Sequence, residues 1–480
     1  MSGFGRRIVT GVNWSIFNLL GGQCVHFIRS LILARLLSPE DFGCIGTLTI
    51  FITVSQMFVN AGFGSALIQK KKPTQIDYST IFWWNFFVSI LLYCLLCLLA
   101  PYIAAYFRNE LICPILRVWG IMLIINAFYT IQYNMMTKRL DFRTICLLDL
   151  SSDVVATIIA IGMAWSGCGV WALIAQQIAY GVVRLILVRY IVRWYPQRCF
   201  SISSLKGLFR FGGYIFANRL IQMICQEYQS ILIGRRFSIE QVGYYTRANG
   251  LSKTLKVSIP NLIQQVLYPV YSDMQDTREK IHRLFEKSIR IVTFSVYPLM
   301  FILILAAHRL ILFLYGDTWS TSIPYFRILC VSGFFTCLQN INVSVVSATG
   351  NSRQLFLIGL YKYAVLLLCL HIGSSLWGIE GLLWGTVAGN FNMCVTNFIF
   401  TARCIGFTVL RQIRNIIPVF IIGTIGFCAA VTVYYLTCCH IGISILIFIF
   451  VYLILAVAFR LKVLHDVREV AEIFFERRKR

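Results

Sequence analysis

Long apolar runs alternate with short polar and basic stretches along almost the whole chain, and this pattern predicts a protein that crosses a membrane many times. A helix needs about 20 mainly apolar residues to span the hydrocarbon core of a bilayer. Runs of that length recur about fourteen times, so we predict an all-α polytopic fold. The expected spans are residues 11–33, 42–65, 80–106, 114–136, 145–165, 169–190, 211–233, 243–269, 289–307, 322–348, 354–372, 379–401, 416–436 and 441–459.

The composition agrees with this fold class. Of the 480 residues, 58% are hydrophobic and 13% are charged, whereas a soluble domain carries about 25% charged residues. The first apolar run is too long, and too polar at its start, for a cleaved signal peptide, so we expect it to be retained as a helix. The net charge of +24 is spread over short loops instead of being gathered in one groove, which argues against nucleic-acid binding.

The distribution of basic residues predicts the orientation in the membrane. One set of loops holds most of the Lys and Arg, including residues 70–72 and the last four residues of the chain, and the other set holds few. Basic loops stay on the cytoplasmic side, and an even number of spans brings both ends of the chain to one side. We therefore expect both termini in the cytoplasm.

Polar positions also reveal an internal repeat. Each copy has an apolar run that ends near an Arg, followed by a Ser cap and an acidic first turn that begins the next helix. Asn18, Ser30, Arg35, Ser38, Glu40 and Gly43 recur 200 positions later as Asn218, Ser230, Arg235, Ser238, Glu240 and Gly243. We therefore predict two parallel, pseudo-equivalent six-helix bundles and two additional helices. The expected domains are an N-terminal lobe at 1–193, a cytoplasmic linker at 194–210, a C-terminal lobe at 211–403, and two helices with a basic tail at 404–480.

Two cytoplasmic segments are amphipathic. Residues 273–290 place Ile281, Phe285 and Ile289 on one helical face and basic residues on the other, and residues 466–475 repeat the pattern. We predict that both segments lie in the membrane interface, with their basic residues on anionic headgroups. A solvated charged helix is the alternative for each.

Polar and ionisable residues inside the expected spans supply the candidate site. Such groups cost a few kcal/mol in a membrane, so they face a cavity or a partner. A basic set would suit an anionic headgroup, because Arg and Lys both bind phosphate oxygens, although each member could instead snorkel from a helix end. This set is Arg29, Arg219, Lys253 and Lys256. Further polar residues recur at helical spacing and would line the cavity: Asn18, His26, Asn218, Gln222 and Gln226.

Three acidic residues are candidates for coupling transport to an ion. Glu227 could carry a proton or pair with Arg219, while Asp149 and Asp153 could bind a cation or hydrogen-bond within the first bundle. Catalytic signatures are missing: the chain has neither a Gly-Lys-Ser/Thr phosphate loop nor an HExxH pair. Its 17 cysteines lie almost entirely in apolar runs, where cysteine acts as a small hydrophobe. We expect no enzyme activity, cofactor or metal site.

Five segments stand in a characteristic order and spacing. They are residues 33–43, 62–69, 209–212, 242–248 and 269–273. Together they resemble the polysaccharide-transport branch of the multidrug/oligosaccharidyl-lipid/polysaccharide exporter superfamily, the Wzx-type lipopolysaccharide and O-antigen flippases. The likeness covers essentially the whole chain.

The resemblance implies two lobes that alternate between inward and outward openings in a bacterial inner membrane. It implies a substrate built on undecaprenyl diphosphate, whose oligosaccharide is moved from the cytoplasmic to the outer leaflet in lipopolysaccharide, capsule or exopolysaccharide biosynthesis. On the same ground we expect coupling to a proton or sodium gradient or to the membrane potential, and contacts with membrane lipids and polysaccharide-assembly proteins. Because the family has no short site motif, only a general role of basic residues in the first, seventh and eighth helices carries over.

Other interpretations of the sequence stay open. A multidrug-type, cation-coupled exporter would need an acidic cavity, whereas the inferred cavity is basic. A non-catalytic scaffold of an envelope polysaccharide complex would tolerate the loss of its intramembrane charges. A membrane polymerase or ligase would need a long outer loop with catalytic Arg or His, and none of the outer loops is long enough.

Overall fold

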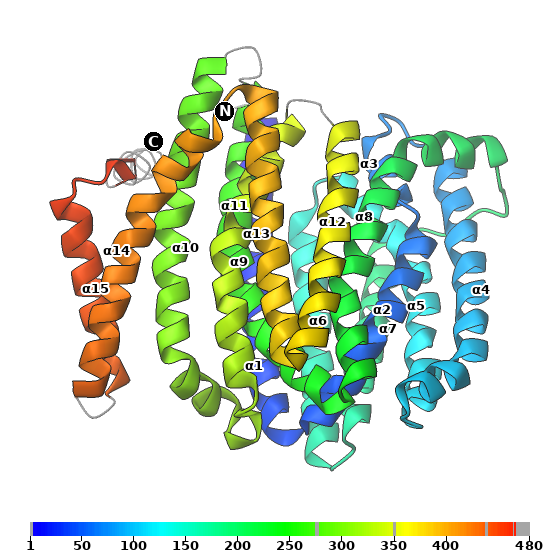
Figure 1. Cartoon of the computed structure of the whole chain (residues 1–480). Coiled ribbons are helices and arrows are strands. Elements are labelled where there is room, and N and C mark those ends of the chain that lie inside the picture. The colour runs from blue at the N-terminus through cyan, green and yellow to red at the C-terminus, as the bar shows by residue number, and fades with distance from the viewer. Residues whose placement is uncertain (1–2, 274–277, 349–351, 437–439, 464, 467–480) are drawn as a thin grey trace. The chain divides into compact units, whose positions relative to one another are not determined.

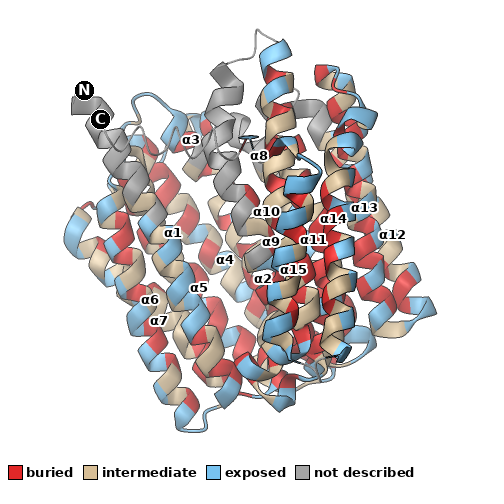
Figure 2. Ribbon diagram, turned by 90° about the vertical axis from the view of Figure 1, so that its left-hand side faces the viewer, coloured by how far each residue is buried: buried red, intermediate tan, exposed pale blue. Residues whose placement is uncertain are grey.

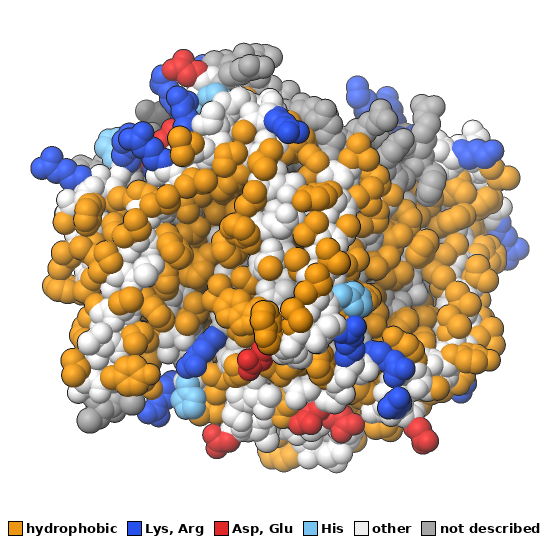
Figure 3. All heavy atoms as spheres, viewed as in Figure 1, with side chains coloured by type: hydrophobic (Ala, Val, Ile, Leu, Met, Phe, Trp, Pro, Cys, Tyr) orange, Lys and Arg blue, Asp and Glu red, His pale blue; other side chains and the backbone are white. Residues whose placement is uncertain are grey.

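The computed structural model describes residues 3–273, 278–348, 352–436, 440–463 and 465–466, and over these residues the chain is helical without a strand (Figure 1). It divides into two compact units, Met1–Gly243 and Tyr244–Arg480. On each unit the visible face is covered mainly by hydrophobic side chains, and Lys and Arg gather toward the helix ends (Figure 3). This distribution is that of a multi-pass membrane protein.

The first unit contains eight helices and the beginning of a ninth. They are α1 (Gly3–Leu36), α2 (Pro39–Asn60), α3 (Phe63–Gln69), α4 (Gln75–Phe107), α5 (Ile112–Lys138), α6 (Phe142–Trp165), α7 (Val170–Val192) and α8 (Ile202–Arg236). The chain enters the second unit within α9 (Ile239–Asp273) and continues through α10 (Arg278–Tyr315), a 3₁₀ turn (Asp317–Trp319), α11 (Ser322–Ala348), α12 (Ser352–Leu376), α13 (Gly378–Ile405), α14 (Val409–Leu436) and α15 (Ile441–Ala458).

Every expected span falls on one of these helices, which confirms the predicted fold class. Eleven helices are long and apolar enough to cross a membrane, while α8, α9 and α13 are as long but contain no equally apolar stretch among the described residues. The prediction missed α3, which lies partly inside the expected span 42–65. Ala61 and Gly62 have φ values of 39° and 76° and end α2 there, because the left-handed conformation cannot continue a right-handed helix.

The predicted turn between α1 and α2 is confirmed. The Ser38 hydroxyl accepts a hydrogen bond from the Asp41 amide (3.2 Å), and the Asp41 carboxylate accepts one from the Ser38 amide (2.9 Å). This reciprocal capping satisfies donors that the first helical turn leaves unpaired. In the second copy of the repeat, Ser238 accepts from the amide of Gln241 (3.2 Å).

The repeated glycines serve a close backbone contact inside the first unit. A Cβ atom on Gly43 would lie 1.9 Å from the carbonyl oxygen of Ile239, and a Cβ atom on Gly243 would lie 1.8 Å from that of Pro39. The contact is therefore reciprocal between the two copies of the repeat. Only glycine fits at either position, because the nearest atoms belong to the backbone and cannot move aside as a flexible side chain could.

Buried side chains line one side of most helices, and exposed ones the other (Figure 2). In the first unit, Leu48, Phe107, Trp119 and Ile174 belong to one core cluster that joins α2, α4, α5 and α7. Lipid tails are as apolar as these side chains, so close packing rather than the hydrophobic effect holds such helices together.

In the second unit, α14 and α15 pack against α10 through aromatic rings. Phe301 of α10 lies 5.9 Å from Phe420 of α14 and 6.2 Å from Phe448 of α15, measured between ring centroids. Gly423 allows this approach, because a Cβ atom there would lie 2.6 Å from the Phe301 ring. The last two spans are thus an integral part of the second unit.

The segment before α8 is hydrogen-bonded to the first turns of α4. Trp194 Nε1 donates to Gln75 Oε1 (2.8 Å), and the Gln197 amide donates to Ser79 Oγ (3.0 Å). Asp77, which is 2% exposed, also accepts hydrogen bonds from Lys70 and from Ser204 of α8. These bonds fix the start of α8 to α4.

The prediction that residues 273–290 lie in the membrane interface is wrong for the described part of that segment. Residues 278–290 form the start of α10, and the apolar face of Ile281, Phe285 and Ile289 is buried by protein. The Phe285 ring meets Phe407 edge-on at 5.3 Å. Phe407, which is distant in the sequence, thus covers the apolar face of α10, for which the sequence pattern does not identify a partner. Of the second amphipathic segment, all residues after 466 lie outside the described part.

Candidate functional site

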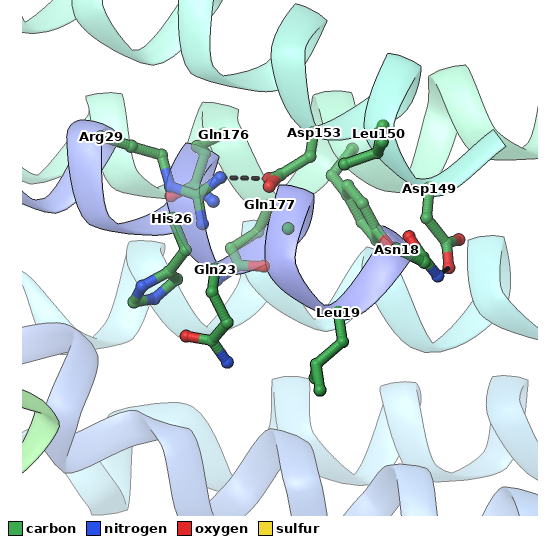
Figure 4. A pocket seen from close by; sticks show the side chains of 12 residues that line it. Asn18, Leu19, Gln23, His26, Arg29, Asp149, Leu150, Asp153, Gln176 and Gln177 are labelled. Carbon is green, nitrogen blue, oxygen red and sulfur yellow. Dashed lines mark hydrogen bonds and ion pairs between the residues drawn. The ribbon is translucent and has the colours of Figure 1, made fainter. Parts of the chain in front are cut away.

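The first unit contains a polar cavity of about 510 Å³ between α1, α6 and α7 (Figure 4). All three helices are among those apolar enough to cross a membrane, so the cavity lies within the membrane-spanning part of the unit. We call it the polar chamber. Its lining residues are Asn18, Leu19, Gly22, Gln23, His26 and Arg29 from α1, Asp149, Leu150 and Asp153 from α6, and Gln176, Gln177 and Tyr180 from α7.

Helical spacing explains why these residues meet. Residues three or four positions apart share one face of a helix. Asn18, Gly22 and His26 follow one another at four-residue steps on α1, and Asp149 and Asp153 do so on α6. Packing of α6 against both α1 and α7 turns these faces toward one another.

One ion pair crosses the polar chamber. Arg29 of α1 reaches Asp153 of α6 through its Nη1 atom (Figure 4) and also donates to Thr157 Oγ1 (3.3 Å). The Arg29 and Asp153 side chains are only 10% and 17% exposed. In a membrane each charge would be costly alone, so each compensates the other.

A second ion pair lies beside the first. Asp149 Oδ1 is 2.8 Å from Arg184 Nη2, and Asp149 Oδ2 accepts hydrogen bonds from Asn18 Nδ2 and the Tyr133 hydroxyl, both at 3.2 Å. The Arg184 guanidinium also lies 4.2 Å from the centroid of the Tyr133 ring and donates to the Tyr180 hydroxyl (3.0 Å). Cation–π contacts of this kind stabilise a desolvated cation.

The two ion pairs make the polar chamber charge-balanced. Two Arg and two Asp cancel formally, and the lining also contains further hydrogen-bonding groups. These are the amides of Asn18, Gln23, Gln176 and Gln177, the imidazole of His26 and the hydroxyl of Tyr180. The chamber can therefore exchange hydrogen bonds with a neutral polar ligand without leaving a charge unpaired.

The structure brings together five of the residues predicted from the sequence: Asn18, His26, Arg29, Asp149 and Asp153 line the same chamber. The other candidates lie on α8 and α9. Arg219, Gln222 and Gln226 are exposed on α8, Glu227 is partly buried there, and the Asn218 side chain lies outside the described part. On α9, Lys253 is exposed, whereas Lys256 is enclosed and donates to Ser332 Oγ (3.1 Å).

Sequence reasoning did not assign Gln176, Gln177 and Tyr180 to the site. A pair of adjacent amides within the apolar run 169–190 was the available signal. Arg184 also lies within this apolar run, but its partner Asp149 is on another helix, so only the fold reveals the pair. Among the described residues, no cluster of three or more His, Cys, Asp or Glu is arranged to hold a metal ion.

A family model described as polysaccharide biosynthesis protein matches residues 32–324, more than half of the chain. The chain belongs to this family. Relatives include the succinoglycan biosynthesis transport protein ExoT of Rhizobium meliloti, 23% identical over 82% of this chain and 78% of its own length. The teichuronic acid biosynthesis protein TuaB of Bacillus subtilis is 24% identical over 73% of each chain. The lipopolysaccharide biosynthesis protein WzxC of Escherichia coli is 21% identical over 79% of this chain and 77% of its own.

Solved structures share the fold. The lipid II flippase MurJ in an inward closed conformation superposes with a TM-score of 0.72 at 14% identity, covering 94% of this chain and 99% of its own. An inward-facing multidrug resistance MATE family transporter of the MOP superfamily gives a TM-score of 0.65 at 16% identity, over 80% of this chain and 94% of its own. The family match and the three relatives confirm the predicted resemblance to polysaccharide-transport proteins, and the solved structures share the fold.

Proposed function

We propose that this protein is a flippase that moves undecaprenyl-diphosphate-linked oligosaccharide from the cytoplasmic to the outer leaflet by alternating access. Family membership supports a role in polysaccharide biosynthesis, and the three relatives are named for the biosynthesis of succinoglycan, teichuronic acid and lipopolysaccharide. The protein would act in the bacterial inner membrane, with both termini in the cytoplasm and alongside polysaccharide-assembly proteins.

The observation that carries the proposal is the lining of the polar chamber. A glycan presents many hydroxyl groups, each both a donor and an acceptor, and must not leave them unpaired inside a membrane. Amides such as Gln23, Gln176 and Gln177 offer both functions within one side chain. A chamber of this kind would replace the water that a sugar loses on entering the membrane.

The ion pairs favour a glycan over a cationic drug. A site for a lipophilic cation would present an unpaired carboxylate, but Asp149 and Asp153 are already paired with Arg184 and Arg29. We therefore assign the two aspartates a positioning role, one of the two interpretations left open by the sequence. The exposed Arg219 of α8 would contact the diphosphate as the glycan crosses.

A strain that lacks the gene tests the proposal. It should lose surface polysaccharide and accumulate the lipid-linked intermediate on the cytoplasmic leaflet, and the wild-type gene should restore both. Gln177→Ala should lower the export rate about fivefold, because one hydrogen bond to substrate contributes about 1 kcal/mol. Gln69→Ala, at an exposed amide at the end of α3, is the matched control. A deletion strain with unchanged surface polysaccharide and lipid intermediates would rule out the flippase.

A further inference from the structure

Lys256 of α9 is an enclosed amine. It occupies the middle of the expected span 243–269 on α9 and is 6% exposed. A charge at this depth costs several kcal/mol unless a partner compensates for it. The groups around this amine therefore determine whether the neutral or the protonated form is more stable.

The hydrogen-bond partners of Lys256 match a neutral amine. Among the described residues its Nζ atom has two acceptors, Ser332 Oγ at 3.1 Å and the carbonyl oxygen of Leu329 at 3.4 Å. A neutral amine has two N–H groups and an ammonium has three, so the two described acceptors match the number of donors of the neutral form. An unpaired buried donor, especially a charged one, is strongly unfavourable.

No described carboxylate forms an ion pair with Lys256, which separates it from the buried arginines. Arg29, Arg184 and Arg290 each pair with an aspartate within the described part of the chain. Among the described residues, the titratable groups near the Lys256 amine are the thiol of Cys330, on the facing helix α11, and the amine of Lys253 on α9 itself. Lys253 has the same charge sign, so it adds to the cost of an ammonium at Lys256.

A second enclosed lysine does not allow the same conclusion. Lys362 of α12 is 9% exposed and donates to Asn397 Oδ1 at 2.9 Å. The neutral amine has two N–H donors and the ammonium has three, but only one acceptor is described for Lys362. The number of acceptors therefore does not distinguish the two protonation states of this lysine. Lys256 is the residue at which the geometry distinguishes the two forms.

We propose that Lys256 is the proton-exchanging group that couples glycan export to a proton gradient. This inference rests on the proposed flippase function. In the enclosed state the amine is neutral; when the transport cycle opens its surroundings to water on the outer side, it takes up one proton, and it releases that proton to the cytoplasm when the cycle opens inward. One proton would thus enter for each glycan exported. An arginine could not serve, because a guanidinium stays protonated.

Purified full-length protein in liposomes tests the coupling. The probe is the lipid-linked oligosaccharide fraction extracted from membranes of the deletion strain, and its leaflet distribution is measured by access to an added glycosidase. Valinomycin and equal potassium concentrations hold the membrane potential at zero. One proton crossing a difference of one pH unit supplies about 1.4 kcal/mol, so the wild-type protein should drive the leaflet ratio to about tenfold.

Lys256→Gln, which is neutral at every pH, should still equilibrate the probe but leave the leaflet ratio near one. Lys280→Gln, at an exposed lysine of α10, should retain the tenfold ratio. Lys256→Arg, a permanent cation, is the second test and should also give a ratio near one. The inference is overturned if either Lys256 variant keeps the wild-type ratio, or if neither variant reaches the membrane, as expected of a purely structural lysine. The inference also fails if the leaflet ratio reached by the wild-type protein does not change when the pH difference is imposed. A wild-type protein that moves no probe between the leaflets would instead refute the proposed flippase function.

Discussion

Removing one partner of the Arg29–Asp153 ion pair should destabilise the protein more than removing both. Both side chains are largely buried, at 10% and 17% exposure. Arg29→Ala would leave the Asp153 carboxylate without its counter-ion, and Asp153→Ala would do the same to the Arg29 guanidinium. An unpaired buried charge of this kind costs about 3–5 kcal/mol.

The double variant leaves no charge behind. It loses the ion pair and the contact of Arg29 with Thr157, which together amount to about 1–3 kcal/mol of hydrogen bonding. The Arg29→Ala/Asp153→Ala protein should therefore unfold at a higher temperature than either single variant. Non-additivity of this sign is expected for residues in direct contact.

The assay is the midpoint of thermal unfolding of the purified protein in detergent, for the wild type, both single variants and the double variant. Arg117→Ala, at an exposed arginine of α5, is the control and should change the stability by no more than about 0.5 kcal/mol. Additive effects of the two single variants would contradict the reasoning. So would an Asp153→Ala variant as stable as the Arg117→Ala control.

Three further variants test the packing of the first unit. Gly43→Ala should lower the free energy of unfolding by about 1–3 kcal/mol or more, because its Cβ would meet the Ile239 carbonyl oxygen. Gly162→Ala, at a glycine with open space around it, should be tolerated. Equal unfolding midpoints for the two variants would refute the close contact. Ser38→Ala should lower stability by about 1 kcal/mol through loss of the helix cap, measured in the same way, and an unchanged midpoint would contradict the cap. Asp77→Ala should loosen the segment before α8 and speed limited tryptic cleavage there; unchanged cleavage would show that these hydrogen bonds do not hold the segment.

The features predicted correctly from the sequence are the local ones. The length of an apolar run sets a span, and Ser38 with Asp41 specifies a helix start within four residues. The exception is the break between α2 and α3, where left-handed backbone at Ala61 and Gly62 interrupts a run whose apolar pattern continues. The periodicity of apolar residues alone does not predict such a break in a helix.

The site was only half predictable, for a physical reason. A stripe of polar residues on α1, including Asn18 and His26, follows from helical periodicity. Which residues face that stripe depends on how α6 and α7 pack, and no local pattern pairs Asp149 with Arg184. The same limit explains the error at the start of α10, whose apolar face is covered by Phe407, a residue distant in sequence.

The most direct test of the flippase account is the transbilayer movement of lipid-linked oligosaccharide in liposomes that contain only this protein. With no gradient imposed, the wild-type protein should bring the probe to equal glycosidase access from both leaflets, protein-free liposomes should not, and Gln177→Ala should do so about fivefold more slowly. If probe placed in the inner leaflet stays inaccessible in the presence of folded wild-type protein, the central claim is wrong.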